Sequence, residues 1–441
     1  MDAARGEESA RARNFSWTAA GRSPPNGAGE LGGTRVEGFL FDLPDLRNAE
    51  FQRHNEESAA LWQAFQDGAH PRIPIRFNTN PRMLMLDPRH NTRRLQYEEY
   101  MGDADIMAEA GLEHQYWRRF LLPGDHEKGL PEAWTLGIDF ENCYDAAWFG
   151  CPMWQRPDQV PDTEPILNSD NKRMLFDRGI PDPFAGALAE RALRFIEHCR
   201  TKCARGWTFL GRPVQPPDWA PFAGNDGLFT IASSLRGPTE LCLDLLEDPE
   251  YVHELLRFIL CAVTARMTAW RELLGKPGRQ DGFCAADDSI QLLSQAQYRE
   301  FVLPLHRQYY DTFATEKDRA IHLCGDAQRH FGVIRDELGV SAFDTGFPID
   351  FAAFRRDLGP DTLICGGPKI SYFLTDDPAP VLAETERILR SGVLEGGRFI
   401  LQEGNNLPPG ARLPVCQAFY EAGQRLGKLR RRAAGKERGM P

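Results

Sequence analysis

The chain has 441 residues, of which 42% are hydrophobic, and its 63 acidic and 52 basic residues give a net charge of −11. This charge and a pI near 5.5 argue against a nucleic-acid-binding protein, because contact with phosphates requires a basic surface. No stretch approaches the roughly 20 apolar residues of a membrane-spanning helix.

Cysteine usage and the first residues indicate the compartment. The ten cysteines are scattered and form no CxxC pair, which is typical of reduced thiols. The first residues contain early acids and no apolar run, so no signal peptide is expected. We therefore expect a cytoplasmic protein without a nucleic-acid or membrane partner.

Composition predicts one large body between two tails. Residues 1–36 are rich in Gly, Ala, Arg and Ser and offer little to pack, so we expect a disordered tail there. The basic residues 428–441 predict a second, solvated tail. Residues 37–427 form the predicted folded domain.

Short apolar or β-branched runs alternate with helical stretches through this domain. That alternation is typical of βα units around a parallel sheet. The candidate strands, in chain order, are Ile73–Thr79, Trp134–Glu141, Arg212–Gln215, Gly282–Asp287, Ala320–Gly325, Ala342–Gly346, Thr362–Gly366 and Arg398–Glu403. Eight such strands predict an α/β fold, a (β/α)8 TIM barrel with decorated loops and flexible termini.

Helix signals are clearest in the second half. Asp248 is a predicted N-cap for a helix over Tyr251–Leu274, with Gly275 as its stop. Ser294 is predicted to cap a helix over 295–301, and a third helix is expected from Pro378 to Ser391.

The fifth predicted strand carries His322 and Cys324. Residues two apart in a strand point to the same face, so this imidazole and this thiol can bind one metal ion together. A nitrogen and a sulfur ligand suit zinc. An HxC pair packed in a strand by chance is the alternative.

Polar side chains recur at the carboxyl ends of the last strands, where barrel enzymes carry their active sites. They are Asp287 and Asp288, His322 and Cys324, Asp344, Cys365, and Glu403. The three aspartates are candidate catalytic residues: each could orient His322, bind a cationic group, act as a general acid or base, or cap a helix.

Two further features are candidates for cofactor binding. Tyr144 and Trp148 belong to an unusually aromatic part of the first half, which suits a planar macrocycle or alternatively fixes long loops to the barrel. Arg236 could receive a carboxylate or phosphate, or form a salt bridge.

Several motifs together resemble the uroporphyrinogen decarboxylase superfamily. The resemblance covers residues 220–425 well and 70–220 only loosely. It is carried by Phe229–Gly237, Leu245–Val252, Ala286–Asp288, Leu293–Ser294 with Tyr298 and Phe301, His322–Gly325, Asp344–Gly346, Phe399–Leu401 and Leu407–Pro409.

This superfamily contains metal-free porphyrinogen decarboxylases and zinc-dependent methyltransferases that move a methyl group between a corrinoid protein and a thiol such as coenzyme M. The decarboxylases carry an arginine-rich signature, AGRYLPEYR-like, near their first strand. This chain has Ile73–Asn78 there and nothing like that signature. The methyltransferases carry HxC on a late strand, which His322 and Cys324 match. The resemblance is therefore closer to the methyltransferase-like branch.

The third zinc ligand of that branch is a cysteine near the end of the barrel. Here Asn405 stands at that position. Glu403 or Cys365 could complete the site instead, and Glu403 is preferred because it stands next to the expected position.

The resemblance implies zinc-dependent methyl transfer between a methyl-corrinoid, carried by a corrinoid protein, and a thiol or other small acceptor. The alternatives are a metal-free carboxy-lyase for a porphyrinogen-like substrate and a barrel that binds a corrinoid or tetrapyrrole without catalysis.

Overall fold

The computed structural model describes residues 34–429, which form an α/β protein. Its largest sheet has five parallel strands that pair in chain order: β5 (Cys284–Ala286), β6 (Ala320–Leu323), β7 (Ala342–Thr345), β8 (Leu363–Gly366) and β9 (Phe399–Leu401). These strands lie within the last five of the eight predicted strands. The predicted parallel sheet is confirmed over this part of the chain.

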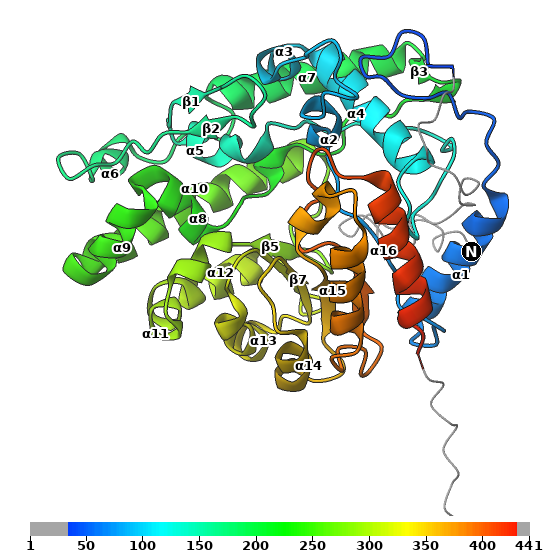
Figure 1. Cartoon of the computed structure of the whole chain (residues 1–441). Helices are drawn as coiled ribbons and strands as arrows, with labels where there is room; N and C mark the ends of the chain where they lie inside the picture. Colours follow the sequence, from blue (N-terminus) through cyan, green and yellow to red (C-terminus); the bar gives the residue numbers. More distant parts are fainter. Residues whose placement is uncertain (1–33, 430–441) are drawn as a thin grey trace, which may run out of the picture.

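Helices of the second half lie around this sheet (Figure 1). They are α10 (Pro249–Leu273), α11 (Gln295–Gln297), α12 (Leu303–Phe313), α13 (Phe331–Leu338), α14 (Phe351–Leu358), α15 (Ala379–Leu389) and α16 (Leu413–Leu426). Consecutive helices from α12 to α14 contact one another, as do α15 and α16. A helix thus follows each of the strands β5 to β9, as βα units require.

The predicted helix starts are confirmed by their caps. The side chain of Asp248 accepts a hydrogen bond from the N–H of Tyr251, and that of Ser294 accepts one from the N–H of Gln297. The helix expected over 295–301 is interrupted, because a π-helical turn, Tyr298–Val302, separates α11 from α12. Pro304 lacks an N–H and cannot continue an α-helical ladder through this point, which accounts for the turn.

The first half contains mainly helices and two short hairpins. Its helices are α1 (Gln52–Gln66), α2 (Arg82–Met85), α3 (Tyr97–Gly102), α4 (Ala104–Phe120), α5 (Tyr144–Trp148), α6 (Met174–Arg178), α7 (Ala187–Ala204), α8 (Leu228–Arg236) and α9 (Pro238–Glu247). The hairpins pair β1 (Met153–Trp154) with β2 (Asp162–Thr163), and β3 (Thr208–Phe209) with β4 (Arg212–Pro213). Short 3-10 turns cover Glu141–Cys143, Pro221–Ala223, Asp288–Leu292, Gln328–His330 and Ile370–Leu374.

The first predicted strand, Ile73–Thr79, lies beside β9. Ile75 and Leu401 form a parallel bridge, with Arg76 N donating to Leu401 O and Leu401 N donating to Pro74 O, each at 3.0 Å. On its other side Ile75 bonds to Asp125 instead of to a second strand. The N–H of Asp125 donates to Ile75 O at 2.9 Å, and the Asp125 carboxylate accepts from Ile75 N at 2.8 Å. The parallel ladder is therefore interrupted here by a loop.

The third predicted strand, over 212–215, is corrected. Its first two residues belong to the antiparallel hairpin, whose turn residues Leu210 and Gly211 both have positive φ, of 51° and 75°. That pair of values is typical of a two-residue type I′ hairpin turn. Prolines 213, 216 and 217 cannot donate to a ladder, so only one parallel bridge forms, between Val214 and Trp134 of the second predicted strand.

The two faces of the large sheet belong to different cores. Ile321, Phe343, Ile364 and Phe399 pack in the main core with the surrounding helices. The opposite, inner face forms a separate cluster, made of Ala320, Ala342, Leu363, Cys365 and Ile400 with Trp62 and Phe65 of α1. Alternation of side chains along each strand produces this division. Helix α1 therefore covers the lower part of the inner face, beneath His322 and Asp344.

The predicted tails lie almost entirely outside the described residues. At the described ends, Val36 N donates to Leu43 O and Leu429 N donates to Pro71 O. Among the described helices, none combines the length and the apolar character that crossing a membrane demands.

Glu113 of α4 fixes the first described segment to the body of the protein. Its side chain accepts hydrogen bonds from the N–H groups of Leu40 at 2.6 Å and Phe41 at 2.8 Å, and the residue is 2% exposed. Burial outweighs these two donors and raises the pKa of Glu113 to about 8. The folded protein thus retains a proton that the unfolded chain releases near the ordinary value of 4.5.

This retained proton predicts a pH-dependent stability. As the pH rises from about 4.5 towards 8, the unfolded chain binds fewer protons at this site than the folded protein, so the free energy of unfolding falls, by up to about 1.4 kcal/mol per pH unit. The Glu113→Gln variant has no titrating group at this site and loses this pH dependence. We therefore expect its free energy of unfolding to rise relative to that of the unmodified protein as the pH increases from about 4.5 to 8. Urea unfolding at several pH values measures the difference, with Glu197→Gln on the exposed side of α7 as the control. A difference that does not change with pH would contradict the expectation.

Candidate metal centre

Strand β6 brings His322 and Cys324 onto one side of the sheet. Cys324 follows the last residue of the strand, and its Sγ lies 3.1 Å from His322 Nε2. Gly325 follows with a φ of +73°, and a Cβ there would lie 1.9 Å from Gln291 Oε1, so the chain needs glycine to turn away at this point. The predicted pairing of the two side chains is present in the structure.

Asp288 adds an oxygen to this pair. It begins the 3-10 turn after β5, and its Oδ1 accepts a hydrogen bond from Cys324 N at 2.7 Å. Ligand atoms of Asp288, His322 and Cys324 all lie within 4.8 Å of one another, and all three residues are half-buried. One nitrogen, one sulfur and one carboxylate oxygen are suitable ligands for zinc. These three residues could hold a metal ion, and we call them the metal centre for that reason.

Asp344 holds the imidazole of the metal centre. It stands opposite His322 in the β6–β7 register, and its Oδ2 lies 3.0 Å from His322 Nδ1. Burial opposes charge on both side chains, yet their attraction outweighs it, raising the pKa of His322 well above its ordinary value and lowering that of Asp344. A carboxylate behind a metal-binding histidine fixes which ring nitrogen faces the metal. Asp344 is therefore placed to orient His322.

Gln402 and Arg76 extend this chain of contacts. Gln402 Nε2 donates to Asp344 Oδ1 at 2.5 Å, and Arg76 Nε donates to Gln402 Oε1 at 2.6 Å. Arg76 Nη2 lies 4.0 Å from Asp344 Oδ1. The sequence reasoning missed Gln402. Counting alternate residues from Ile400, which faces inward, would have identified it.

The two side chains expected as third ligands, Glu403 and Cys365, lie outside the group formed by Asp288, His322 and Cys324. Glu403, one residue beyond Gln402, turns to the opposite side, where its Oε1 accepts from Asn78 N at 2.9 Å. Cys365 lies opposite Asp344 in the register and is buried in the inner-face cluster, where burial raises the pKa of its thiol to about 12.

Asp287 has contacts that are structural. This fully buried carboxylate accepts hydrogen bonds from Phe229 N at 3.0 Å and from Thr230 N and Oγ1 at 2.8 and 2.9 Å. His306 Nε2 lies 3.0 Å from Asp287 Oδ2, the oxygen that also accepts from Phe229 N. Asp287 thus caps the start of α8 and joins it to α12. These contacts give no support to the predicted catalytic role.

The predicted cofactor-binding residues are engaged in packing. Arg236 Nε donates to Asp244 Oδ2 at 2.7 Å, and Trp148 Nε1 donates to Asp182 O at 3.1 Å. Tyr144 donates from its hydroxyl to Asp226 Oδ1 at 3.4 Å. These contacts do not test the predicted roles, but they assign each side chain a structural partner.

Asp226 is an acidic neighbour of the metal centre that the sequence reasoning did not select. Burial, then the nearby Asp145 and Asp288 carboxylates, raise the pKa of Asp226 well above its ordinary value. No motif marks this residue, since its position depends on the packing of the loop before α8.

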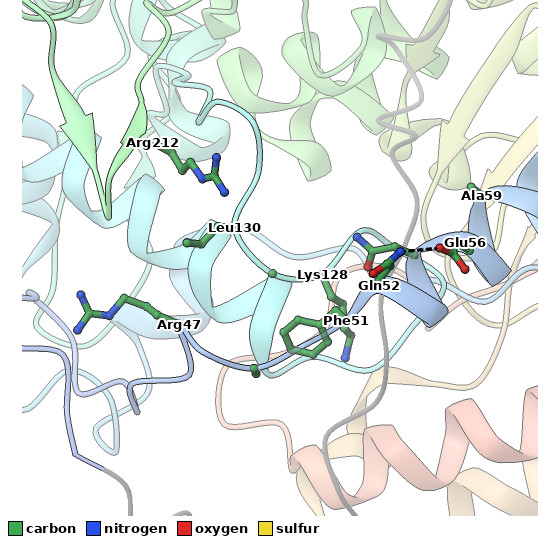
Figure 2. A pocket seen from close by; sticks show the side chains of 11 residues that line it. Arg47, Phe51, Gln52, Glu56, Ala59, Lys128, Leu130 and Arg212 are labelled. Carbon is green, nitrogen blue, oxygen red and sulfur yellow. Dashed lines mark hydrogen bonds between the residues drawn. The ribbon is translucent and has the colours of Figure 1, made fainter.

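Two cavities bear on access to the protein. A surface depression of about 570 Å³ lies against α1, and Figure 2 shows Lys128 beside Phe51 and Gln52, with Arg47 and Arg212 at its other side. It contains none of the predicted site residues. A second cavity, of about 320 Å³, lies at the interrupted ladder beside Ile75 and is lined by Arg76. Only the second cavity shares a residue with the contacts around the metal centre.

Comparison with known proteins agrees with the motifs found in the sequence. Residues 221–426 match the uroporphyrinogen decarboxylase (URO-D) family, and this range contains the metal centre and Asp344. This part of the chain therefore matches the URO-D family, as the sequence motifs predicted.

Similar proteins point to the methyltransferase-like branch. The chain is 26% identical over 234 residues to a methylated-thiol–coenzyme M methyltransferase of Methanosarcina mazei, a match that covers 52% of this chain and 56% of that protein's length. A solved methyltransferase from Methanosarcina mazei superposes with a TM-score of 0.55 at 16% identity, covering 83% of this chain and 98% of the other. The fold is thus shared with that methyltransferase.

Proposed function

We propose that this protein catalyses zinc-dependent methyl transfer between a corrinoid, carried by a partner protein, and a small thiol. The observation that carries the proposal is the convergence of His322, Cys324 and Asp288, supported from behind by Asp344. The similarity to a methylated-thiol–coenzyme M methyltransferase supports the reaction class. The absence of the arginine-rich decarboxylase signature supports it over a porphyrinogen lyase.

The side chains of Asp288, His322 and Cys324 offer the kinds of ligand atom that zinc binds. Asp288 uses one carboxylate oxygen for Cys324 N and retains the other for a metal ion. Zinc held by three protein ligands would leave a position for a thiol and stabilise its thiolate, the form that accepts a methyl group.

The remaining residues prepare this reaction without reacting themselves. Asp344 holds His322 Nδ1, which leaves Nε2 directed towards Cys324. Gln402 and Arg76 hold Asp344 in turn. Each ligand is therefore positioned by a hydrogen bond before any substrate binds, which lowers the cost of assembling the site.

We also propose that the strands form a (β/α)8 barrel around this site. The five-strand parallel sheet, the bridge from β9 to Ile75 and the shared fold of the solved methyltransferase support closure on this side. The parallel bridge between Trp134 and Val214 supports it in the first half.

Elemental analysis combined with a methyl-transfer assay tests the function. The purified protein is expected to contain about one zinc per chain and to demethylate methylcobalamin when a thiol is added, which visible absorbance follows. Treatment with a chelator should abolish the reaction, and added zinc should restore it. Full methyl transfer by the metal-free protein would overturn the role of zinc, and failure to demethylate methylcobalamin with any thiol would favour the metal-free lyase.

A further inference from the structure

The cavity of about 320 Å³ lies where the parallel ladder is interrupted beside Ile75. Its walls come from the first predicted strand, from α4, from the loop over 121–126, from α1 and from the loop after β9. The polar side chains that line it include Arg76, Asn78, His114, Gln115, Arg118 and Asn406. Guanidinium, amide and imidazole groups, all capable of donating hydrogen bonds, thus line one small space.

Arg118 carries an uncompensated positive charge into this cavity. Among the described residues, no carboxylate forms a hydrogen bond or ion pair with its guanidinium. Its neighbour Arg119, by contrast, pairs with Glu127 at 2.9 Å. Burial, then the charges of Arg119 and Arg76, lower the pKa of Arg118 to about 10. Arg118 is half-buried, and a partly desolvated guanidinium without a counter-charge is stabilised when an anion binds it.

The one carboxylate that lines the cavity is occupied elsewhere. Asp125 receives a bidentate pair from Arg72, with both distances at 2.7 Å. It also accepts from Ile75 N and from the hydroxyl of Tyr420, each at 2.8 Å. Four hydrogen bonds satisfy this carboxylate. It therefore cannot neutralise Arg118, and the cavity retains a net positive charge.

The imidazoles of the cavity do not add to that charge. Burial lowers the pKa of His114 to about 3, and it lowers the pKa of His126 well below the ordinary value. Both rings are neutral at physiological pH. His114 Nε2 lies 3.1 Å from Thr79 Oγ1, and His126 Nε2 donates to Arg118 O at 2.7 Å. The second contact fixes the end of α4 from which Arg118 projects.

Arg76 connects the cavity to the metal centre. It lines the cavity, and its Nε donates to Gln402, which in turn holds Asp344 behind His322. A ligand that fills the cavity against Arg76 therefore lies three hydrogen bonds from His322. The arrangement suits a molecule with an anionic end in the cavity and a reactive end at the metal centre.

We propose that Arg118 and Arg76 form a subsite for the anionic group, a carboxylate, sulfonate or phosphate, of the thiol substrate. The cavity is large enough for such a group, and guanidinium pairs bind these oxyanions in bidentate geometry. The proposal rests on the proposed function for the identity of the substrate, but anion binding itself does not depend on it.

Calorimetric titration of the zinc-loaded protein tests the subsite with three probes: methanesulfonate, acetate and inorganic phosphate. At least one is expected to bind saturably, and Arg118→Leu should weaken its binding about 10- to 100-fold, the value of a charge-assisted hydrogen bond. Arg118→Lys should recover part of the affinity. Arg119→Gln, which removes a neighbouring charge already paired with Glu127, serves as the control. Absence of saturable binding by all three, or equal binding in Arg118→Leu, would overturn the subsite.

A second measurement separates this proposal from the proposed function. With methylcobalamin as donor, Arg118→Leu should raise the KM for 2-mercaptoethanesulfonate about 10-fold or more and leave that for the neutral 2-mercaptoethanol unchanged. An equal rise for both thiols would contradict a role in binding the anionic group. Probe binding that depends on Arg118 in a protein without methyl transfer would refute the proposed function and retain the subsite.

Discussion

Replacing Cys324 with alanine is expected to remove nearly all bound zinc and to lower methyl transfer by about 1,000-fold or more, since the metal loses its sulfur ligand. His322→Ala should have the same effect. Cys324 is the thiol 3.1 Å from His322 Nε2, and Asp288 holds its backbone, so no other side chain of the metal centre can replace its sulfur. Zinc content by mass spectrometry and the methylcobalamin assay measure the two effects.

Cys261→Ala provides the matched control for this experiment. Cys261 is an exposed free cysteine of α10, outside the metal centre, so its loss removes a thiol without removing a ligand. Its zinc content and rate should equal those of the unmodified protein. Retention of stoichiometric zinc in both Cys324→Ala and His322→Ala would show that the metal is bound elsewhere.

Asp287 and Asp288 are adjacent carboxylates, and we expect their substitution by alanine to affect different properties. Asp287→Ala is expected to lower the free energy of unfolding by about 3–5 kcal/mol, because it leaves His306 and the two N–H groups at the start of α8 without their buried partner. Asp288→Ala should weaken zinc binding while changing the stability of the metal-free protein by about 1 kcal/mol or less.

Urea unfolding of the chelator-treated variants separates these effects, because bound zinc would itself stabilise the folded state. Each variant serves as the control for the other. A stable but inactive Asp287→Ala protein would restore the catalytic role predicted from sequence. Equal destabilisation by both substitutions would contradict the assignment of Asp288 to the metal centre.

The second half of the fold and the HxC pair were predictable because local rules determine them. Buried strands with helices between them have a strong pattern, and the two-residue spacing of His322 and Cys324 fixes their common face whatever the surrounding structure. Caps such as Asp248 and Ser294 act within one helical turn. These features can therefore be predicted without knowledge of long-range packing.

The features that the sequence did not predict have physical causes. Glu403 was preferred as a ligand although the residue before it, Gln402, faces inward, and a shift of one residue in a strand reverses the side-chain direction. Asp288 was among the polar residues expected at this rim, but as a catalytic candidate, because its hydrogen bond to Cys324, 36 positions away, depends on packing that the sequence does not reveal. In the first half, prolines and the turn at Leu210 and Gly211 outweigh the apolar pattern that predicted a strand.

The cover that α1 places on the inner face has a consequence for the order of folding. Trp62 and Phe65 pack with Leu363 and Ile400, which lie about 300 positions further along the chain. This contact cannot form until nearly all of the chain has been synthesised and the last strands have paired. During folding the five-strand sheet must therefore pass through a state whose inner face is open to water, and newly made protein is most prone to aggregate in that interval.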